Sequence, residues 1–437
     1  MVKGLLTECA MTSEKIRVGM IGLGQRGDVL SCTVLSCDEA EISAISDCYD
    51  DRIEHIEKRV FNKTGKSPIV YKDWKELIHS DSVDVVLICA SWEMHVEMAV
   101  AAMKAGKIVA LEVGGAYSIE DCWKLVNAYE ETKTPIMMME NCCYDRFELL
   151  TTSLVRAGKL GEIVHCHGAY SHDLRDEILG GNVNRHYRLK NYINRNCDNY
   201  PTHEIGPIAK IIGINRGNKM VSLVSVASKA RGLEAFELSD KNPDKSLIGQ
   251  KFRQGDIIST IITCENGETV TLTLDTTLPK YYSREFTVRG TKGLCNQEAN
   301  MVFLEGVNDS HEFFEPENTI KKYLNNAEEY SDYQVDAWKN ITQEEKDLGH
   351  GGMDYIMFKD FFGRVKRGEE LPIDVYDAAA WMSITALSEQ SIKEGGKTVE
   401  VPDFTRGAWK ERKPMDVVKF PVVNDDKSKD NNSTETR

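Results

Sequence analysis

The glycine-rich stretch at residues 16–30, IRVGMIGLGQRGDVL, restricts the fold of this chain more than any other. Its apolar start, Ile16 to Ile21, predicts a buried β-strand, and the residues after the glycines predict a helix. In a GxGxxG turn the first glycine permits a tight bend, the second lets a pyrophosphate reach the backbone, and the third lets helix and strand pack closely. The unpaired N–H groups of the helix then face the phosphates. The turn residues expected to bind such a cofactor are Gly22, Leu23, Gly24, Gln25, Arg26 and Gly27.

A carboxylate follows the second predicted strand. The segment AEISAISD ends in Asp47, twenty residues after Gly27, where an acidic side chain accepts hydrogen bonds from the adenosine ribose of a dinucleotide. No arginine follows Asp47 directly, as would suit a 2′-phosphate. Together with the glycine turn, Asp47 predicts NAD rather than NADP as the cofactor.

Segments with strand and helix patterns alternate up to about residue 144. Alternation at this spacing predicts an α/β domain, a doubly wound parallel sheet with helices on both faces. Ligands of such sheets bind at the carboxyl ends of the strands. Beyond the turn, the cofactor-binding residues expected at these ends, or one helical turn later, are Ser91, Trp92, His95, Glu112 and Asn141, with Glu140 beside them.

From about residue 145 the pattern changes to alternating runs such as VSLVSVASKA and IISTIITCENGETVTLTLDTT. Period-two alternation predicts strands, and ENGE predicts a hairpin turn at Asn266–Gly267. We expect an α+β domain with an open, largely antiparallel sheet. Two final helices, in GGMDYIMFKDFFGRVKRG and DVYDAAAWMSITALSEQSIKEG, are expected to pack back on the first domain.

Four parts are therefore expected along the chain. They are an N-terminal extension at residues 1–14, an NAD-binding Rossmann domain at 15–144, a substrate and oligomerisation domain at 145–423, and a tail at 424–437. The tail is charged and polar without apolar periodicity, which predicts disorder.

Composition narrows the partners and the compartment. The chain carries 54 basic and 69 acidic residues, a net charge of −15, which disfavours nucleic acid and anionic membranes as partners. No run approaches the roughly 20 apolar residues of a membrane span, and the N-terminus has no signal-peptide pattern. The twelve cysteines contain no CxxC pair. We expect them to be reduced, without a metal site, in a cytoplasmic protein.

Six segments, in order and compatibly spaced, link the chain to a known family: ASWEMHVEMAVAAMKAGKIVALEV, MMMENCCYDRFELL, GAYSHDLR, YPTHEIGPIAKIIGINRG, LDTTLPKYYSREFTVRGTKG and HGGMDYIMFKDF. The two-domain pattern resembles the Gfo/Idh/MocA superfamily, which includes glucose-fructose oxidoreductase and inositol dehydrogenase. Within it these segments resemble glycoside hydrolase family 109, the NAD-dependent alpha-N-acetylgalactosaminidases. The resemblance covers nearly the whole chain apart from both termini.

One departure from the superfamily's dehydrogenases bears on the reaction. Those enzymes usually carry Glu-Lys-Pro after the strand that we place at KIVALEV, and their lysine assists proton transfer from the reacting hydroxyl. Here the residues are Glu112, Val113 and Gly114. The glycosidase branch also lacks the lysine, so its absence favours net hydrolysis over simple alcohol oxidation.

The resemblance implies a mechanism without net redox change. NAD takes a hydride from C3 of the sugar, the resulting ketone acidifies the C2 proton, and a side-chain base removes that proton. Elimination then expels the aglycone from C1, water adds, and the hydride returns to C3. Because the leaving group departs from an enolate, the carboxylate pair of ordinary glycosidases is unnecessary.

The resemblance also implies roles for residues at matching positions. The catalytic residues implied are Tyr282, His203, Tyr200 and Tyr170, and Glu140 and Tyr200 are implied to bind the sugar. His172 and Arg188 belong to segments that could either contact the substrate or form only a solvated turn or loop. We count both as candidate substrate-binding residues.

Two of these residues have protonation requirements. Pro201 and the isoleucine spacing after it predict a helix start in YPTHEIGPIAKIIG, and the helix dipole there disfavours a protonated His203. A neutral imidazole can accept the proton of the C3 hydroxyl. Tyr282 would need a lowered pKa, from nearby Arg284 or from the nicotinamide charge, to act as the C2 base.

Two other functions remain open from the sequence. An NAD-dependent sugar or polyol dehydrogenase with net oxidation would accumulate NADH, and a sugar- or NAD-sensing protein would turn nothing over. The expected glycosidase would act on a small carbohydrate glycoside and release its aglycone without net NADH. Assembly as a homo-oligomer, a dimer or a tetramer, is expected by analogy with the superfamily.

Overall fold

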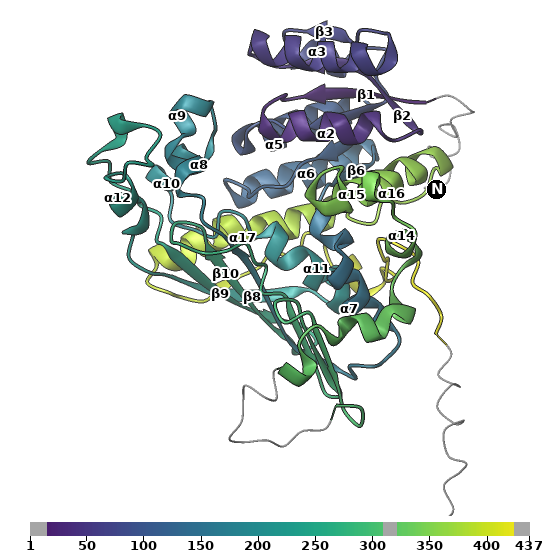
Figure 1. The fold of residues 1–437 in the computed structure, drawn as a ribbon, viewed down its shortest axis with the longest axis vertical. Helices are drawn as coiled ribbons and strands as arrows, with labels where there is room; N and C mark the ends of the chain where they lie inside the picture. The colour runs from purple at the N-terminus through teal and green to yellow at the C-terminus, as the bar shows by residue number, and fades with distance from the viewer. Residues whose placement is uncertain (1–14, 309–320, 424–437) are drawn as a thin grey trace, which may run out of the picture.

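The computed structural model describes residues 15–308 and 321–423. The expected N-terminal extension and the expected tail lie outside the described residues. The described chain contains a smaller parallel sheet with its helices, at the top of Figure 1, and a larger sheet below it, with further helices between the two.

The first half forms a six-stranded parallel sheet in the order β3-β2-β1-β4-β5-β6. The central strands β1 and β4 are buried along almost their whole length, which explains their continuous apolar sequences. The expected doubly wound sheet is confirmed. Its strands are β1 (Ile16–Ile21), β2 (Ala40–Ser46), β3 (Ile69–Tyr71), β4 (Val85–Ile88), β5 (Ile108–Leu111) and β6 (Ile136–Met138). Its helices are α2 (Gln25–Leu35), α3 (Asp50–Thr64), α4 (Trp74–Ile78), α5 (Trp92–Lys104) and α6 (Ile119–Thr132).

The second half forms an eight-stranded sheet in the order β13-β12-β11-β7-β10-β9-β8-β14. All neighbours are antiparallel except β7 and β10, which run parallel. The expected hairpin joins β9 to β10 through Asn266 and Gly267, where Gly267 has a φ of +99°. The strands are β7 (Ile163–Ser171), β8 (Met220–Ala227), β9 (Ile257–Cys264), β10 (Thr269–Asp275), β11 (Thr287–Gly290), β12 (Gly293–Asn296), β13 (Met301–Leu304) and β14 (Val399–Glu400).

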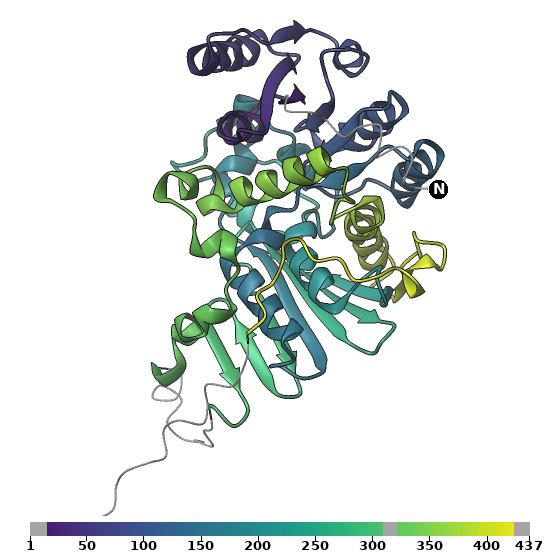
Figure 2. The ribbon, with the colours of Figure 1, turned by 90° about the vertical axis from the view of Figure 1, so that its right-hand side faces the viewer.

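Helices of the second half cover one face of the larger sheet and return to the first domain, as the views in Figures 1 and 2 show. Helix α17 (Val375–Lys393) packs against both α6 and β8, and α16 (Met353–Arg367) packs against α2. α11 (Thr202–Ile212) crosses β7. Both final helices thus contact helices that flank the parallel sheet.

Several short elements complete the described chain. The α-helices are α7 (Arg146–Arg156), α8 (Arg175–Leu179), α9 (Gly181–Asn184), α10 (Arg188–Asn194), α12 (Gly232–Phe236), α14 (Asp336–Lys339) and α15 (Gln343–Lys346). The 3-10 turns are η1 (Asn141–Tyr144), η2 (Lys245–Leu247), η3 (Asn326–Tyr333), η4 (His350–Gly352) and η5 (Ala408–Lys410). Residues 172–196, which hold α8, α9 and α10, form an insertion after β7 that reaches the Rossmann domain, where Arg52 donates to the carbonyl of Asn184.

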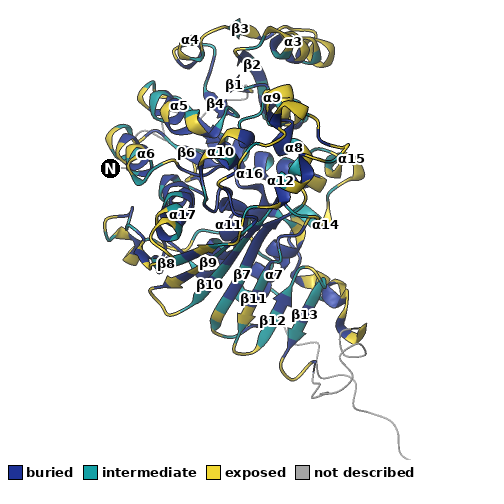
Figure 3. Cartoon of the chain, turned by 90° about the vertical axis from the view of Figure 1, so that its left-hand side faces the viewer, coloured by how far each residue is buried: buried dark blue, intermediate teal, exposed yellow. Residues whose placement is uncertain are grey.

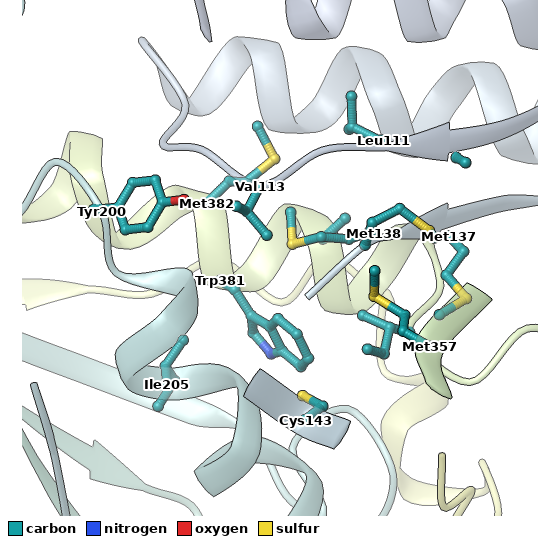
Figure 4. Packing of buried hydrophobic residues seen from close by; sticks show 14 of the residues in the cluster. Leu111, Val113, Met137, Met138, Cys143, Tyr200, Ile205, Met357, Trp381 and Met382 are labelled. Carbon is teal, nitrogen blue, oxygen red and sulfur yellow. The ribbon is translucent and has the colours of Figure 1, made fainter. Parts of the chain in front are cut away.

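The two domains share one apolar core. Trp381 of α17 is fully buried and lies between Met138 at the end of β6 and Ile205 of α11 (Figure 4). Buried residues continue from the parallel sheet through these helices to the inner face of the larger sheet (Figure 3). The junction of the two sheets is therefore packed like a domain interior, which fixes the second domain against the carboxyl ends of the parallel strands.

Candidate active site

The glycine turn fits a dinucleotide. Gly22 has a φ of +87°, and a Cβ atom there would lie 2.6 Å from the carbonyl carbon of Cys89. A Cβ atom at Gly27 would lie 2.1 Å from the carbonyl oxygen of Gly22, so a larger residue would push α2 away from β1. Helix α2 begins at the exposed Gln25, with Gly24 as its N-cap and no side-chain cap. The free N–H groups of this helix end are the donors that a pyrophosphate requires.

Asp47 stands directly after β2 with its carboxylate held in place. It accepts hydrogen bonds from the backbone N–H groups of Leu23, at 2.6 Å, and Tyr49, at 2.9 Å. Arg52 lies 3.8 Å from the same carboxylate. A fixed acidic group therefore stands beside the glycine turn, as recognition of the adenosine ribose requires.

Arg26 of the glycine turn is held by two carboxylates. Its guanidinium donates to Asp354 of α16 at 2.7 and 2.8 Å and lies 3.1 Å from Glu112. His350 Nδ1 is 2.9 Å from the same Asp354 carboxylate. Burial acts to raise the pKa of Asp354, but Arg26 and His350 outweigh it and hold that pKa well below its usual range. Asp354 thus joins the cofactor turn to the second domain.

The end of β4 is shaped by an aromatic ring. Ser91 is the N-cap of α5, and Trp92 after it is 3% exposed. A Cβ atom at Gly114 would lie 2.5 Å from Trp92 Cδ1, so this ring takes the space of a larger residue. His95, expected near the cofactor, is bonded to the carbonyl of Ala90 at 2.9 Å, and burial lowers its pKa to about 4.

The position of the superfamily's lysine is apolar. Val113 is 4% exposed and belongs to the shared core. Burial raises the pKa of the neighbouring Glu112, with Arg26 acting in the opposite direction. The end of β5 therefore supplies a buried carboxyl group, Glu112. The next position, where a lysine would stand, holds the uncharged Val113.

Glu140 and His203 form a buried carboxylate–imidazole pair. His203 Nδ1 lies 2.6 Å from Glu140 Oε1, and Glu140 is fully buried. A Cβ atom at Gly206 would lie 2.8 Å from Glu140 Cγ, so the glycine lets α11 approach the carboxylate. Asn141, the next residue, donates to Asp354 at 2.8 Å. Glu140 and Asn141 thus link the end of β6 to α11 and to α16.

The protonation states of this pair follow from opposing effects. Burial lowers the pKa of His203, although Glu140 acts to raise it. Burial acts to raise the pKa of Glu140, but His203, Thr202 and the backbone of Cys142 outweigh it and lower that pKa. A neutral imidazole that donates from Nδ1 to a carboxylate leaves Nε2 as an acceptor. The helix start predicted a neutral His203, and the lowered pKa of His203 agrees with that prediction. Burial is the largest cause of this lowering.

The predicted sugar-site residues lie together as a row of rings. The Tyr170 and Tyr200 rings are 4.4 Å apart, and His203 lies 4.8 Å from Tyr200 and 5.5 Å from Tyr170. His172 lies 4.8 Å from Tyr170 and 5.2 Å from Tyr282, measured between ring centroids. The end of β7, the start of α11 and the chain after β10 bring these five side chains to one place.

Arg188 enters this row from the insertion. Its guanidinium lies over the rings of Tyr200, at 4.9 Å, and Trp92, at 5.2 Å, and donates to the Tyr170 hydroxyl at 3.4 Å. It is 7% exposed and pairs with Glu177 at 2.8 Å. Arg188 is therefore a buried side chain of the aromatic site and is not part of a solvated loop.

Tyr282 is tied to a second buried charge network. Arg284 donates to the Tyr282 hydroxyl at 3.0 Å and pairs with Glu148, at 2.7 Å, and Asp145, at 2.9 Å. Although Tyr282 is half exposed, burial of its hydroxyl end raises its pKa, and Arg284 only partly opposes this. The lowered pKa that a C2 base needs is thus absent from these residues alone.

Glu204 turns away from His203, as its position in the helix suggests. It is 1% exposed and interacts with the fully buried Asp198. Burial raises the pKa of Asp198 to about 7 and that of Glu204 well above its usual range. Burial therefore disfavours ionisation of both carboxyl groups, and the negative charge of Asp198 adds to this effect at Glu204.

Glu140, Cys142 and His203 also place three donor atoms within 4.8 Å of one another. Two of these donors are already joined by the 2.6 Å hydrogen bond. Burial raises the pKa of the Cys142 thiol well above its usual range, which opposes the thiolate that a metal would need. We therefore interpret this group as a hydrogen-bonded pair beside a neutral thiol.

Sequence reasoning assigned no role to three residues of these networks. Asp354 and His350 lie in the quoted segment HGGMDYIMFKDF, which could have indicated them. Glu148 lies in MMMENCCYDRFELL, whose helical pattern gives no sign that a carboxylate there meets Arg284.

Comparisons with known proteins agree with this architecture. Residues 144–411 match the family described as "Glycosyl hydrolase 109, C-terminal domain", and residues 16–140 match "Oxidoreductase family, NAD-binding Rossmann fold". The chain is 37% identical to an alpha-N-acetylgalactosaminidase of Tannerella forsythia over 422 residues, 91% of this chain and 88% of that protein. It is also 37% identical to a glycosyl hydrolase family 109 protein of Parabacteroides distasonis, over 92% of this chain and 89% of that protein.

Two solved structures of dehydrogenases share this fold. A levoglucosan dehydrogenase in complex with NADH and levoglucosan aligns with a TM-score of 0.64 at 18% identity, over 89% of this chain and 100% of its own. A myo-inositol 2-dehydrogenase from Lactobacillus plantarum aligns with a TM-score of 0.62 at 17% identity, over 89% and 100%. At these identities the likeness concerns the fold.

The glycine turn, Asp47 and the second sheet define an NAD-dependent enzyme on the Gfo/Idh/MocA fold. The chain belongs to glycosyl hydrolase family 109 and is an NAD-dependent glycosidase. Among the residues that the structure describes, no helix combines the length and apolar character needed to cross a membrane.

Proposed function

We propose that the enzyme removes a terminal sugar of the alpha-N-acetylgalactosamine type by elimination and water addition, with no net redox change. The observation that carries the proposal is the buried Glu140–His203 pair beside Tyr170, Tyr200 and Tyr282. The relatives named as alpha-N-acetylgalactosaminidases support the choice of sugar.

The residues of the chain have separate tasks in this proposal. NAD, when bound, supplies the hydride acceptor for C3 and gives the hydride back. His203, with Nδ1 fixed by Glu140, takes the C3 hydroxyl proton at Nε2. Tyr282 takes the C2 proton, and Arg284 beside its hydroxyl partly opposes the rise in pKa that burial causes.

Substrate binding is assigned to the remaining rings. Tyr170 and Tyr200 offer hydroxyl groups and ring faces to the sugar, and His172 extends this surface toward Tyr282. Arg188 donates hydrogen bonds to sugar oxygens from within the aromatic row. Rings that stack on a sugar while their polar ends hydrogen-bond are suited to such a ligand.

A second candidate is a dehydrogenase with net oxidation, as in the structural neighbours. The buried Val113 counts against it, because dehydrogenases of the superfamily usually carry their proton-transfer lysine at that position. A panel of aryl alpha- and beta-glycosides in deuterated water separates the two. We expect aglycone release with deuterium at C2 and no accumulating NADH. Release without C2 deuterium would refute elimination, and NADH stoichiometric with product would establish the dehydrogenase.

We also propose a cytoplasmic location and a dimer or tetramer. The eleven cysteines of the described residues are all free, which supports a reducing compartment. Light scattering after size exclusion measures the mass directly, and a monomer at working concentration would contradict the oligomer. The boundary near residues 144 and 145 remains a prediction, which limited proteolysis would test.

A further inference from the structure

Glu140 is a buried carboxylate without a fixed cation. It is fully buried, and His203 is its only ion-pair partner among the described residues. Its hydrogen bonds come from His203 and from the backbone N–H of Cys142. Among the described residues no lysine or arginine forms an ion pair with Glu140, so its negative charge is met by the His203 imidazole and the Cys142 N–H. A charge buried in this way is costly unless an opposite charge joins it.

The nearest guanidinium groups are already committed to other carboxylates. Arg26 is shared by Asp354 and Glu112. On the other side of His203, Arg284 is shared by Glu148 and Asp145. Each guanidinium thus pairs with two carboxyl groups, and neither forms an ion pair with Glu140.

The lysine that could have supplied a cation is replaced by the buried Val113. The described residues around the ends of β5 and β6 therefore carry more carboxyl groups than cations. In a doubly wound sheet the nicotinamide half of a dinucleotide lies at the carboxyl ends of these later strands. Glu140 and Asn141 directly follow β6, and Glu112 directly follows β5.

We propose that Glu140 biases the bound cofactor toward its oxidised form. The oxidised nicotinamide ring carries a positive charge and the reduced ring is neutral, so a nearby uncompensated carboxylate stabilises only the former. This inference rests on the proposed redox-neutral reaction for its purpose, because such an enzyme must give the hydride back to the sugar. A site that favours the cationic ring drives that return.

The bias appears as a ratio of affinities. Protein stripped of cofactor, with its fold checked by circular dichroism, is titrated separately with NAD+ and with NADH, and binding is followed by calorimetry. We expect the wild type to bind NAD+ more tightly than the Glu140→Gln variant does. Glu140→Gln, which removes the charge and keeps the shape, should shift the ratio of the two dissociation constants toward NADH by about ten- to a hundred-fold.

The matched control is Asp377→Asn. Asp377 is a carboxylate of similar burial in α17 that accepts from Asn215 and lies 3.9 Å from Lys210. Among the described residues no hydrogen bond or ion pair joins it to Glu140 or to the glycine turn. Its removal should leave the ratio at the wild-type value. If Glu140→Gln cannot be obtained folded, Glu140→Ala provides the same test, because it removes the same negative charge and should shift the ratio in the same direction.

An unchanged ratio in a folded Glu140→Gln variant overturns the proposal, as does an equal shift in Asp377→Asn. Neither measurement involves a glycoside. The bias can thus fail while C2 deuteration still supports the glycosidase, and the glycosidase mechanism can fail while the affinity ratio still responds to Glu140.

Discussion

Two adjacent tyrosines, Tyr281 and Tyr282, differ in what their hydroxyl groups contact. Tyr282 accepts a hydrogen bond from Arg284 and its ring meets His172. Tyr281 is 67% exposed and donates to Glu298 at 2.7 Å. Only Tyr282 therefore combines a cationic neighbour with the aromatic row, and single-atom substitutions can separate its chemistry from its packing.

Tyr282→Phe should lower the rate of aglycone release by about a hundred- to ten-thousand-fold, because it removes the proposed C2 base. NAD binding should be retained. Initial rates with an aryl glycoside, beside a cofactor titration, provide the measurement. Tyr281→Phe is the control and should keep most of the rate. Full turnover by the Tyr282 variant would remove this tyrosine from the mechanism.

The His203 pair predicts a pH dependence. Burial lowers the pKa of His203, so its neutral, active form persists as the pH falls through about 6.5, the usual pKa of histidine. The acid limb of kcat/KM should therefore lie below that pH. Because Glu140 raises the pKa of His203, the weakened activity of Glu140→Gln should show an acid limb at still lower pH. A limb that moves upward would contradict this assignment.

At the scale of elements, the strand–turn–helix at residues 16–35 depends on close backbone approach. The Cβ position of Gly27 overlaps the backbone of Gly22, which cannot move without displacing β1. By contrast, a Cβ atom at Gly363 of α16 would meet only the flexible end of Arg367. The same substitution at these two helical glycines should thus have opposite consequences.

Gly27→Ala should abolish measurable NAD binding, because α2 must shift from the position at which its N–H groups face the pyrophosphate. Gly363→Ala should bind NAD normally and gain a little stability, since alanine favours a helix by up to about 1 kcal/mol over glycine. Calorimetric titration of both variants decides the matter. Tight NAD binding by Gly27→Ala would show that the turn tolerates a side chain.

The elements differ in how far the sequence could predict them. Strands such as β4 and helices such as α17 have long apolar patterns, and the structure contains them where expected. The insertion at 172–196 has helices of four to seven residues, too short for a period to be read. Its Arg188 consequently left two interpretations open, and the packing against Trp92 and Tyr200 excludes only the solvated loop.

Local sequence patterns predicted only part of the site. The turn glycines and Asp47 follow from spacing, whereas Tyr170, Tyr200, His203 and Tyr282 required a family resemblance. The Arg26–Asp354 contact joins residues 328 positions apart, and no local pattern encodes such a pairing. The protonation state of Tyr282 could not be predicted from the sequence. Burial is the main cause of the raised pKa of Tyr282, and burial is a property of the folded chain.

At the scale of the whole molecule, the shared core predicts one cooperative unit. Trp381 is fully buried where α17, α11 and the end of β6 meet. The expected result in scanning calorimetry is a single unfolding transition for both domains. Two resolved transitions would show that the domains unfold separately despite this packing.

Trp381→Ala should destabilise the protein by about 3 to 5 kcal/mol, because it leaves a large cavity at the junction. Chemical denaturation measures the change. Trp74→Ala in α4, whose tryptophan is only partly buried and remote from the junction, should cost clearly less. Equal destabilisation by both substitutions would contradict a larger contribution of the junction to stability.

The parallel pairing of β7 and β10 has a consequence for how new specificities can arise. Because the two strands point the same way, the connections that leave them, residues 172–196 and 276–286, emerge at one rim. One delivers His172 and Arg188, and the other delivers Tyr282. The segment after β10 also pairs with β7, because Ser283 and Ser171 exchange backbone hydrogen bonds, so changes of length belong before Ser283. The two connections also hydrogen-bond to each other, through Asp173 and Lys280 and through Leu174 and Thr276. Descendants of this scaffold can thus acquire different sugars by grafting the two loops as a matched pair, and recombination in the laboratory should move both together.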